Sequence, residues 1–182
     1  HFAAAYGSFN VYTFNADETV TVEPVYYDPD VVESLNSRLM LFYMGDQRDA
    51  SDLLEAQSTA TAEKEGVLSA MSDMVDPMVE ILSGRGDLSD IGPMLHESWL
   101  LKRSITDRIS NDEIDMAYGR AMEAGAAGGK LVGAGGGGFL MFFVEPSLQP
   151  DVATALTGMP FIKPRFDSAG SRITYYEPDR LV

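Results

Sequence analysis

The sequence predicts an α+β fold in which strands at both ends of the chain flank a helical middle. Aromatic and β-branched residues cluster near the start of the chain and again after residue 138. Between residues 50 and 125 the apolar residues recur instead with the spacing of amphipathic helices. Helices and strands kept in separate parts of a chain are typical of an α+β sandwich.

The first predicted element is a β-hairpin. Ser8–Phe14 and Thr19–Tyr26 are rich in aromatic and β-branched residues and alternate partly between apolar and polar. Asn15–Glu18 supplies turn-forming residues between them. We therefore expect two antiparallel strands joined by a tight turn.

A domain boundary is predicted just after the hairpin. A short helix over Val31–Ser37 is followed by the compact apolar run Arg38–Tyr43, which indicates a buried strand. We expect residues 1–37 to be the tail end of one domain and residues 38–182 to form a second one.

Four helices are predicted in the middle of the chain. Pro77 should kink or restart the second of them, because proline lacks an N–H and clashes with the preceding turn. Ser110 and Glu113 match the capping-box pattern at the start of the fourth. Met94, Met116 and Met122 are expected to fill the core. The predicted ranges are Ala50–Glu65, Val67–Leu82, Leu88–Ile105 and Ser110–Gly125.

The last third of the chain predicts a glycine-rich turn, a strand, a short helix and a closing pair of strands. The turn over Gly128–Gly138 should lead directly from a helix into a strand, because an apolar run follows it. The elements after the turn are expected at Phe139–Val144, Gln149–Leu156, Phe161–Phe166 and Arg172–Tyr176, with turn residues at Asp167–Ser171.

Composition excludes several classes of function. The 28 acidic residues outnumber the 13 basic ones and give a formal net charge of −15, so neither nucleic acid nor an anionic membrane is expected as a partner. The absence of cysteine excludes disulfides and thiol catalysis, and His1 and His96 are too few for a histidine metal centre. No apolar run reaches about 18 residues, and no signal peptide is visible. These features favour the cytoplasm. The chain starts with His1 instead of Met, which we interpret as a cut within a longer protein.

Glycine is concentrated at the predicted turn, where eight of the chain's 17 glycines lie within Gly125–Gly138. Glycine is favoured where the backbone takes a positive φ or approaches a ligand closely, and successive N–H groups there can bind one anion. The pattern fits neither a dinucleotide fingerprint, which should open a helix, nor a Walker loop, which needs lysine at Phe139. A phosphate-handling turn and a ligand-free tight turn both remain open on these grounds.

The wider string GGKLVGAGGGGFLMFF (Gly128–Phe143) closely resembles the third conserved motif of GHMP kinases, the superfamily of galactokinase, homoserine kinase and mevalonate kinase. Three other stretches resemble one branch of it, the D-glycero-D-manno-heptose 7-phosphate kinases: AAAYGSFN (Ala3–Asn10), LFYMGDQRDASDLL (Leu41–Leu54) and LHESWLLKRSITDRISNDEID (Leu95–Asp115). The likeness extends from Phe2 to Tyr175.

The resemblance implies the carboxyl-terminal part of a two-domain kinase with a ferredoxin-like α/β sandwich. It implies transfer of the γ-phosphoryl group of ATP, with Mg²⁺, to the anomeric hydroxyl of a heptose 7-phosphate. The glycine motif would then pack against a phosphate-binding loop of the missing amino-terminal domain. That loop and the family's aspartate, which would directly precede His1, are not in these 182 residues. We therefore expect no turnover by this chain alone.

Candidate site residues follow from the motif and from its neighbours. No catalytic residue and no metal ligand is expected within the chain. Each candidate also has a plain structural interpretation, such as a surface ion pair of Arg48, a solvated Lys130 or a helix ion network for His96 with Glu97 and Lys102. The candidates near the nucleotide phosphates are Lys130, Gly133, Ala134, Gly135, Gly136, Gly137 and Gly138, and those near the substrate are Tyr6, Gly7, Arg48 and His96.

Two other functions remain open from the sequence. One is a GHMP kinase acting on another sugar, such as galactose or fucose. The other is a non-catalytic module that binds a nucleotide, a phosphorylated ligand or a protein. We also expect a homodimer through the partly apolar face that the missing half would cover.

Overall fold

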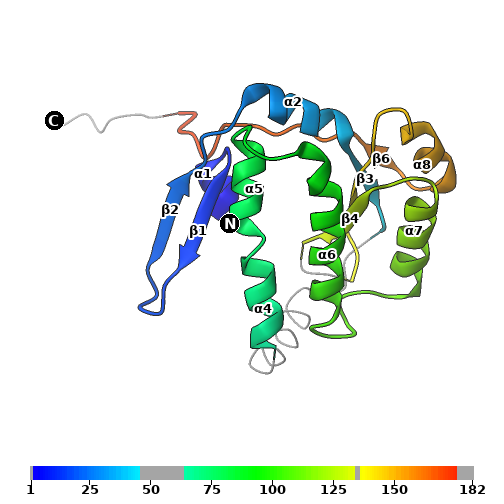
Figure 1. Ribbon diagram of the computed structural model, residues 1–182, viewed down its shortest axis with the longest axis horizontal. Coiled ribbons are helices and arrows are strands. Elements are labelled where there is room, and N and C mark those ends of the chain that lie inside the picture. The colour runs from blue at the N-terminus through cyan, green and yellow to red at the C-terminus, as the bar shows by residue number, and fades with distance from the viewer. Residues whose placement is uncertain (1, 46–63, 134–135, 176–182) are drawn as a thin grey trace.

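A computed structural model of the chain describes residues 2–45, 64–133 and 136–175 (Figure 1). Its centre is a four-stranded antiparallel sheet in the order β4-β5-β3-β6, and a separate two-stranded sheet is formed by β1 and β2. The strands are β1 (Asn10–Phe14), β2 (Val20–Pro24), β3 (Leu39–Tyr43), β4 (Gly128–Val132), β5 (Phe139–Phe143) and β6 (Phe161–Ile162). The helices are α1 (Phe2–Tyr6), α2 (Pro29–Arg38), α4 (Glu65–Ser72), α5 (Val75–Leu82), the short 3₁₀ helix η1 (Leu88–Asp90), α6 (Ile91–Arg103), α7 (Asp112–Glu123) and α8 (Gln149–Ala155).

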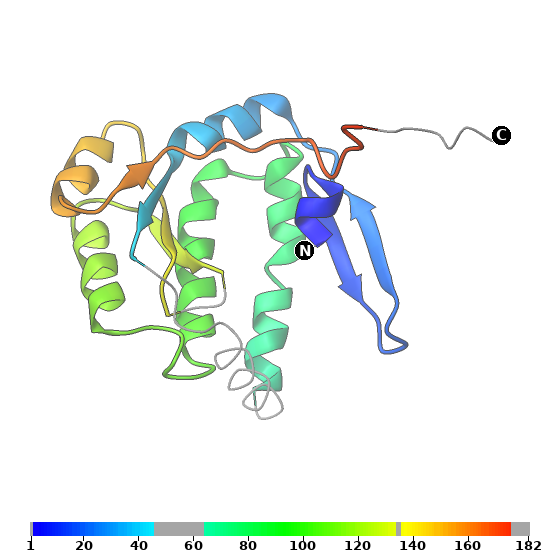
Figure 2. The ribbon, with the colours of Figure 1, turned by 180° about the vertical axis from the view of Figure 1, so that it is seen from behind.

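The strand order confirms the predicted fold class. In chain order the four strands of the large sheet are β3, β4, β5 and β6, so the first and third of them lie in the middle, as in a ferredoxin-like sandwich. Helices separate β3 from β4 and β5 from β6, and the short turn between β4 and β5 makes a hairpin. Figure 2 shows from behind how the segment after β6 runs beside α2 toward α1 and the hairpin.

Both faces of the central strands are buried. Met40 and Phe42 of β3 pack with Trp99 in one core cluster, which also takes side chains from α7 and α8. Leu39 and Phe143 face a second cluster with side chains from α2, α5 and the start of α6. Because β3 and β5 bury both faces, they appear in the sequence as nearly continuous apolar runs.

The predicted hairpin, short helix and buried strand are confirmed. Asn15 N–H donates to the carbonyl of Thr19 at 2.9 Å and closes the turn between β1 and β2. The side chain of Asp28 accepts from the N–H of Asp30 at 2.8 Å and caps α2, whose first turn holds Pro29. In Figure 1 the hairpin stands apart from the large sheet.

The predicted helix Val67–Leu82 is two helices, α4 and α5. Pro77 lies in the first turn of α5, where its missing N–H leaves no helical bond unmade, so the predicted restart is confirmed. Most of the predicted helix Ala50–Glu65 lies outside the described residues.

Two predictions about α7 are wrong. The helix is capped by Asn111, whose side chain accepts from Ile114 N–H at 3.0 Å, and not by Ser110. The hydroxyl of Ser110 donates to the carboxylate of Asp115 instead, at 2.5 Å. Met116 was expected in the core but is 56% exposed, because it lies on the outer side of α7.

The predicted helix-to-strand turn over Gly128–Gly138 is also wrong in its first half, because β4 occupies Gly128–Val132. Glycine is uncommon in strands, and the reason for it here is tertiary. A Cβ on Gly128 would overlap the backbone carbonyl of Gly92 in α6, and one on Gly129 would overlap the carbonyl of Met141 in β5. Only glycines allow α6, β4 and β5 to pack this closely.

The predicted closing pair of strands is reduced to one short strand. Phe161–Ile162 pairs with β3, whereas residues 172–175 form no strand. The segment after β6 instead joins the start of the chain, where Ser171 N–H donates to the carbonyl of Ala5 at 2.8 Å. Tyr176 lies outside the described residues.

Candidate functional site

The glycine turn connects β4 to β5 and is held by two neighbouring loops. Gly133, Gly136 and Gly138 have φ values of 99°, 72° and 98°, a conformation that favours glycine. Gly136 N–H donates to the carbonyl of Ile109 at 3.0 Å, and Gly138 N–H to that of Gly45 at 3.3 Å. These two amides are therefore engaged within the protein and are not available as donors to an anion.

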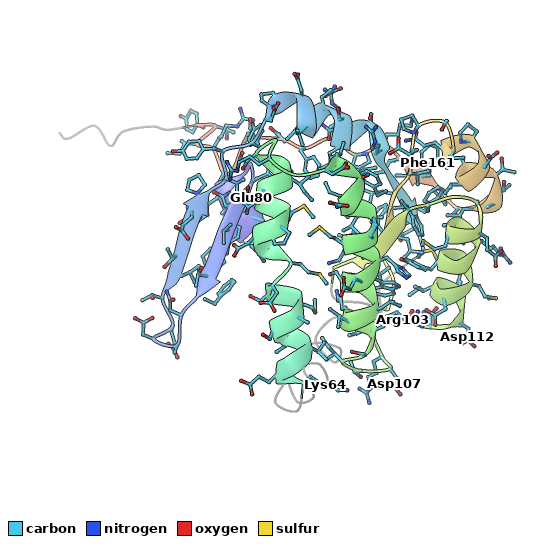
Figure 3. All side chains as sticks on the ribbon, viewed as in Figure 1. Lys64, Glu80, Arg103, Asp107, Asp112 and Phe161 are labelled. Atoms are coloured by element: carbon cyan, nitrogen blue, oxygen red, sulfur yellow. The ribbon has the colours of Figure 1, made fainter. Side chains whose placement is uncertain are left out.

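Ile109 belongs to the loop that connects α6 to α7. Arg103, Asp107 and Asp112 mark the course of this loop at one end of the molecule (Figure 3). Residues 134–135 of the turn, the predicted candidates Ala134 and Gly135, lie outside the described residues. Gly137 is described and buried in the turn.

Lysine side chains gather beside the turn, between β4 and α6. The Nζ of Lys130 lies 3.3 Å from the hydroxyl oxygen of Ser98. The Nζ of Lys102, one helical turn beyond Ser98, donates to the carbonyl of Gly133 at 2.6 Å. Burial lowers the pKa of Lys130, and burial followed by the nearby charge of Lys130 lowers the pKa of Lys102.

Lys102 is the residue that sequence reasoning undervalued. The sequence places it only as a neighbour of His96 on one predicted helix, and nothing in the local pattern links it to Lys130. The packing of α6 against β4 brings the two together. The signal that could have suggested this is the glycine pair at the start of β4, since it permits a helix to lie directly on the strand.

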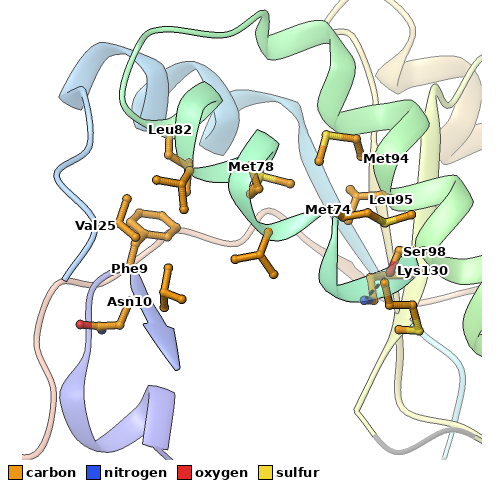
Figure 4. A pocket seen from close by; sticks show the side chains of 14 residues that line it. Phe9, Asn10, Val25, Met74, Met78, Leu82, Met94, Leu95, Ser98 and Lys130 are labelled. Atoms are coloured by element: carbon orange, nitrogen blue, oxygen red, sulfur yellow. Dashed lines mark hydrogen bonds between the residues drawn. The ribbon is translucent and has the colours of Figure 1, made fainter. Parts of the chain in front are cut away.

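A cavity of about 320 Å³ opens between the β1–β2 hairpin and the helices α4, α5 and α6 (Figure 4). Phe9 and Val25 line it on the hairpin side, and several methionines, among them Met74 and Met78, line the helical side. Its polar lining consists of Asn10, Ser98 and Lys130. In Figure 4 Ser98 and Lys130 lie together at the end of the cavity away from the hairpin. The Lys130 ammonium group beside the glycine turn therefore borders the cavity.

His96 is engaged in a structural network. Its Nδ1 lies 2.7 Å from the hydroxyl of Tyr118, and the two rings stack at 5.8 Å with an interplanar angle of 18°. The same hydroxyl donates to the carbonyl of Gly129 at 3.2 Å. Burial raises the pKa of Tyr118 to about 12. His96 therefore connects α6 to α7 and β4 in this structure.

The remaining substrate candidates lie near the hairpin or outside the described residues. Tyr6 is 56% exposed and packs edge-on against Tyr12, with ring centroids 6.2 Å apart. Gly7 has φ 68°, and a Cβ there would overlap the backbone of Ala169 and Gly170. Arg48 lies outside the described residues. The structure thus brings together Lys130 and the glycine turn, whereas Tyr6 and Gly7 lie beside the hairpin and the segment after β6.

Two features are absent from the part of the chain that the structure describes. No three His, Cys, Asp or Glu side chains within it gather as a metal ion would require. No helix in the same part is long and apolar enough to span a membrane.

Comparisons with known proteins agree with this architecture. Residues 78–159 match the family described as "GHMP kinases C terminal". The crystal structure of a D-glycero-D-manno-heptose 1-phosphate kinase from Bacteriodes thetaiotaomicron superimposes with a TM-score of 0.62 and 26% identity, covering 93% of this chain and 45% of that one. The fold, the glycine turn and these matches show that the chain is similar to the carboxyl-terminal domain of GHMP kinases.

Within that class the sequence resembles sugar kinases. It is 31% identical over 157 residues to the D-glycero-alpha-D-manno-heptose 7-phosphate kinase of Campylobacter jejuni, which covers 85% of this chain and 46% of that protein. It is 26% identical over 129 residues to a bifunctional fucokinase/GDP-fucose pyrophosphorylase of Arabidopsis thaliana, over 68% of this chain and 12% of that protein. The chain thus spans about half the length of the first relative and a smaller part of the second. The predicted GHMP kinase resemblance is confirmed.

Proposed function

We propose that this chain is the carboxyl-terminal part of an ATP-dependent kinase that phosphorylates heptose 7-phosphate at its anomeric hydroxyl. The observation that carries the proposal is the 31% identity to the Campylobacter jejuni heptose 7-phosphate kinase over 157 residues. We further propose that residues 1–37 complete the amino-terminal domain of that kinase, that residues 38–182 form its other domain, and that it acts in the cytoplasm.

Phosphoryl transfer suits a site of this kind. The transferred group carries negative charge throughout the reaction, so an enzyme accelerates it mainly by positioning and by neutralising charge. Lys130 is half-buried beside the glycine turn and would supply positive charge for an ATP phosphate. When bound, ATP supplies the phosphoryl group and Mg²⁺ supplies further positive charge. The backbone of the glycine turn would lie against the phosphates, since without side chains it can approach them closely.

The catalytic carboxylate and the phosphate-binding loop would come from the amino-terminal half. The chain covers 46% of its heptose kinase relative, which supports this division of labour. We therefore expect the 182 residues alone to show no ATP turnover.

The test is an assay of ADP release with ATP, Mg²⁺ and D-glycero-D-manno-heptose 7-phosphate. It is run on this chain alone and on the chain joined to the amino-terminal half that the proposal requires. Heptose-dependent turnover is expected only from the joined protein. Turnover by the 182 residues alone would contradict the division of labour, and a joined protein inactive on every sugar would contradict the kinase assignment.

A second candidate substrate is fucose. It is favoured by the match to the plant fucokinase, which extends over 68% of this chain. The same assay with fucose and galactose in place of the heptose phosphate decides between the candidates by their values of kcat/KM.

A further inference from the structure

Two of the chain's four lysines, Lys102 and Lys130, lie close together between α6 and the end of β4. The whole sequence contains four: Lys64, Lys102, Lys130 and Lys163. Ser98 and Lys102 are four residues apart on one side of α6. Lys130 reaches Ser98 and Lys102 reaches Gly133, at 3.3 and 2.6 Å, so both ammonium groups lie between α6 and the end of β4.

No carboxylate compensates these two charges in the described part of the chain. The ion pairs found there are all formed by arginines. Both lysines are half-buried, and burial lowers the pKa of each. Two partly desolvated cations close together are unfavourable without an anion, and this is unexpected in a protein whose net charge is −15. A bound anion would offset both costs.

The donors available there match a phosphoryl group. Each ammonium group has three N–H donors. Lys130 uses one of them on Ser98 and Lys102 uses one on Gly133, so two remain on each lysine. The hydroxyl of Ser98 is a further donor. A phosphoryl group carries nearly two negative charges near pH 7 and three acceptor oxygens, which suits two cations better than a carboxylate does.

We propose that Lys102, Lys130 and Ser98 form a seat for a phosphoryl group, which we call the lysine seat. The group enters from the cavity of about 320 Å³, because Ser98 and Lys130 line that cavity. The proposal deepens the proposed kinase function, since both substrates of such a kinase carry phosphoryl groups. It concerns binding by residues of this chain, so it can be tested without turnover.

The first experiment observes the lysines directly. The chain is labelled with ¹³C at the ε-carbon of lysine, which leaves the charge and all N–H donors of each lysine in place, and its four lysine signals are followed by NMR while inorganic phosphate is added. The signals of Lys102 and Lys130 should shift together along one saturating curve, whereas those of Lys64 and Lys163 should stay nearly fixed. Absence of a saturable shift at Lys102 and Lys130, or equal shifts of all four, would overturn the proposal.

The second experiment measures phosphate affinity by calorimetry for K102M, K130M and the control K163M. Methionine preserves most of the length of lysine and removes its charge. A hydrogen bond to a charged group contributes enough that each seat variant should lose at least about tenfold in affinity. K163M has the same change in net charge at an exposed position and should bind as the parent does.

Circular dichroism first verifies that each variant is folded, and K102Q replaces K102M if methionine disturbs the packing. Unchanged phosphate affinity in the folded seat variants overturns the proposal. Comparing ADP with glucose 6-phosphate as the probe shows whether the seat takes the phosphate of a nucleotide or of a sugar. If the seat binds phosphate and the joined protein is inactive on every sugar, the kinase proposal fails and the seat stands.

Discussion

Gly128 shows how one missing Cβ permits the whole site. Its backbone lies against the carbonyl of Gly92, so α6 rests directly on β4. That contact places Ser98 and Lys102 beside Lys130 and the glycine turn. The site therefore depends on a backbone contact as much as on its charged side chains.

Replacing Gly128 with alanine should destabilise the protein strongly. The new methyl group has no space, and α6 must move away from β4. Overpacking of this kind costs about 1–3 kcal/mol and sometimes more, measurable by urea unfolding. G119A is the matched control, because nothing lies within 4 Å of a Cβ at Gly119 in the middle of α7. It should stabilise the protein by about 0.5–1 kcal/mol, and equal effects of the two substitutions would contradict the argument.

Tyr118 should make the fold sensitive to alkali. Its pKa is raised to about 12 in the folded protein, against about 10 for an exposed tyrosine. The group therefore contributes stability that is present below about pH 10 and is lost as the pH rises toward 12, because only the unfolded state releases the proton easily.

The measurement is urea unfolding of the parent and of Y118F from neutral pH upward. The difference in unfolding free energy between them should shrink above about pH 10. A constant difference would show that the hydroxyl does not titrate as the structure indicates. The control is Y26F, because Tyr26 is 90% exposed and its loss should leave the pH dependence of the unfolding free energy unchanged.

At the scale of elements, the sequence predicts best where local pattern and tertiary role coincide. The hairpin, α2, β3, β5 and α8 have the expected apolar patterns, turn residues or caps, and all are confirmed. β4 is missed because Gly128 and Gly129 have low strand propensity, and only α6 and β5 explain them. The Lys102–Lys130 contact escapes prediction for the same reason, since it exists only once α6 has packed on β4.

The start of α7 offers a test of capping at the element scale. Asn111 accepts from Ile114 N–H at 3.0 Å, whereas the predicted capping box used Ser110 and Glu113. N111A should therefore lower the unfolding free energy by about 1 kcal/mol. E113A should change it by less than about 0.5 kcal/mol, because Glu113 is exposed. A larger loss of unfolding free energy in E113A than in N111A would instead support the predicted capping box of Ser110 and Glu113.

At the scale of the whole molecule, charge and apolar surface are unevenly distributed. The net charge of −15 repels anions in general, so a phosphate ligand depends on a local cationic spot such as the lysine seat. The hairpin and α1 expose several aromatic side chains: Phe2 by 41%, Tyr6 by 56%, Phe14 by 69% and Tyr26 by 90%. Figure 1 shows this hairpin at one side of the molecule and α7 at the other.

The exposed aromatic surface predicts that the 182-residue chain associates with itself through the hairpin. Large apolar patches on a protein surface favour contact with a second surface. The double variant F14T/Y26S should shift the sedimentation profile toward the monomer, since it removes the two most exposed of these four rings. M116Q removes a side chain that is 56% exposed on α7 and should leave the profile unchanged. A monomeric parent, or an equal response to both variants, would exclude the hairpin as the contact. Binding of inorganic phosphate by F14T/Y26S should stay at the parental level, because Ser98 and Lys130 of the lysine seat line the end of the cavity away from the hairpin.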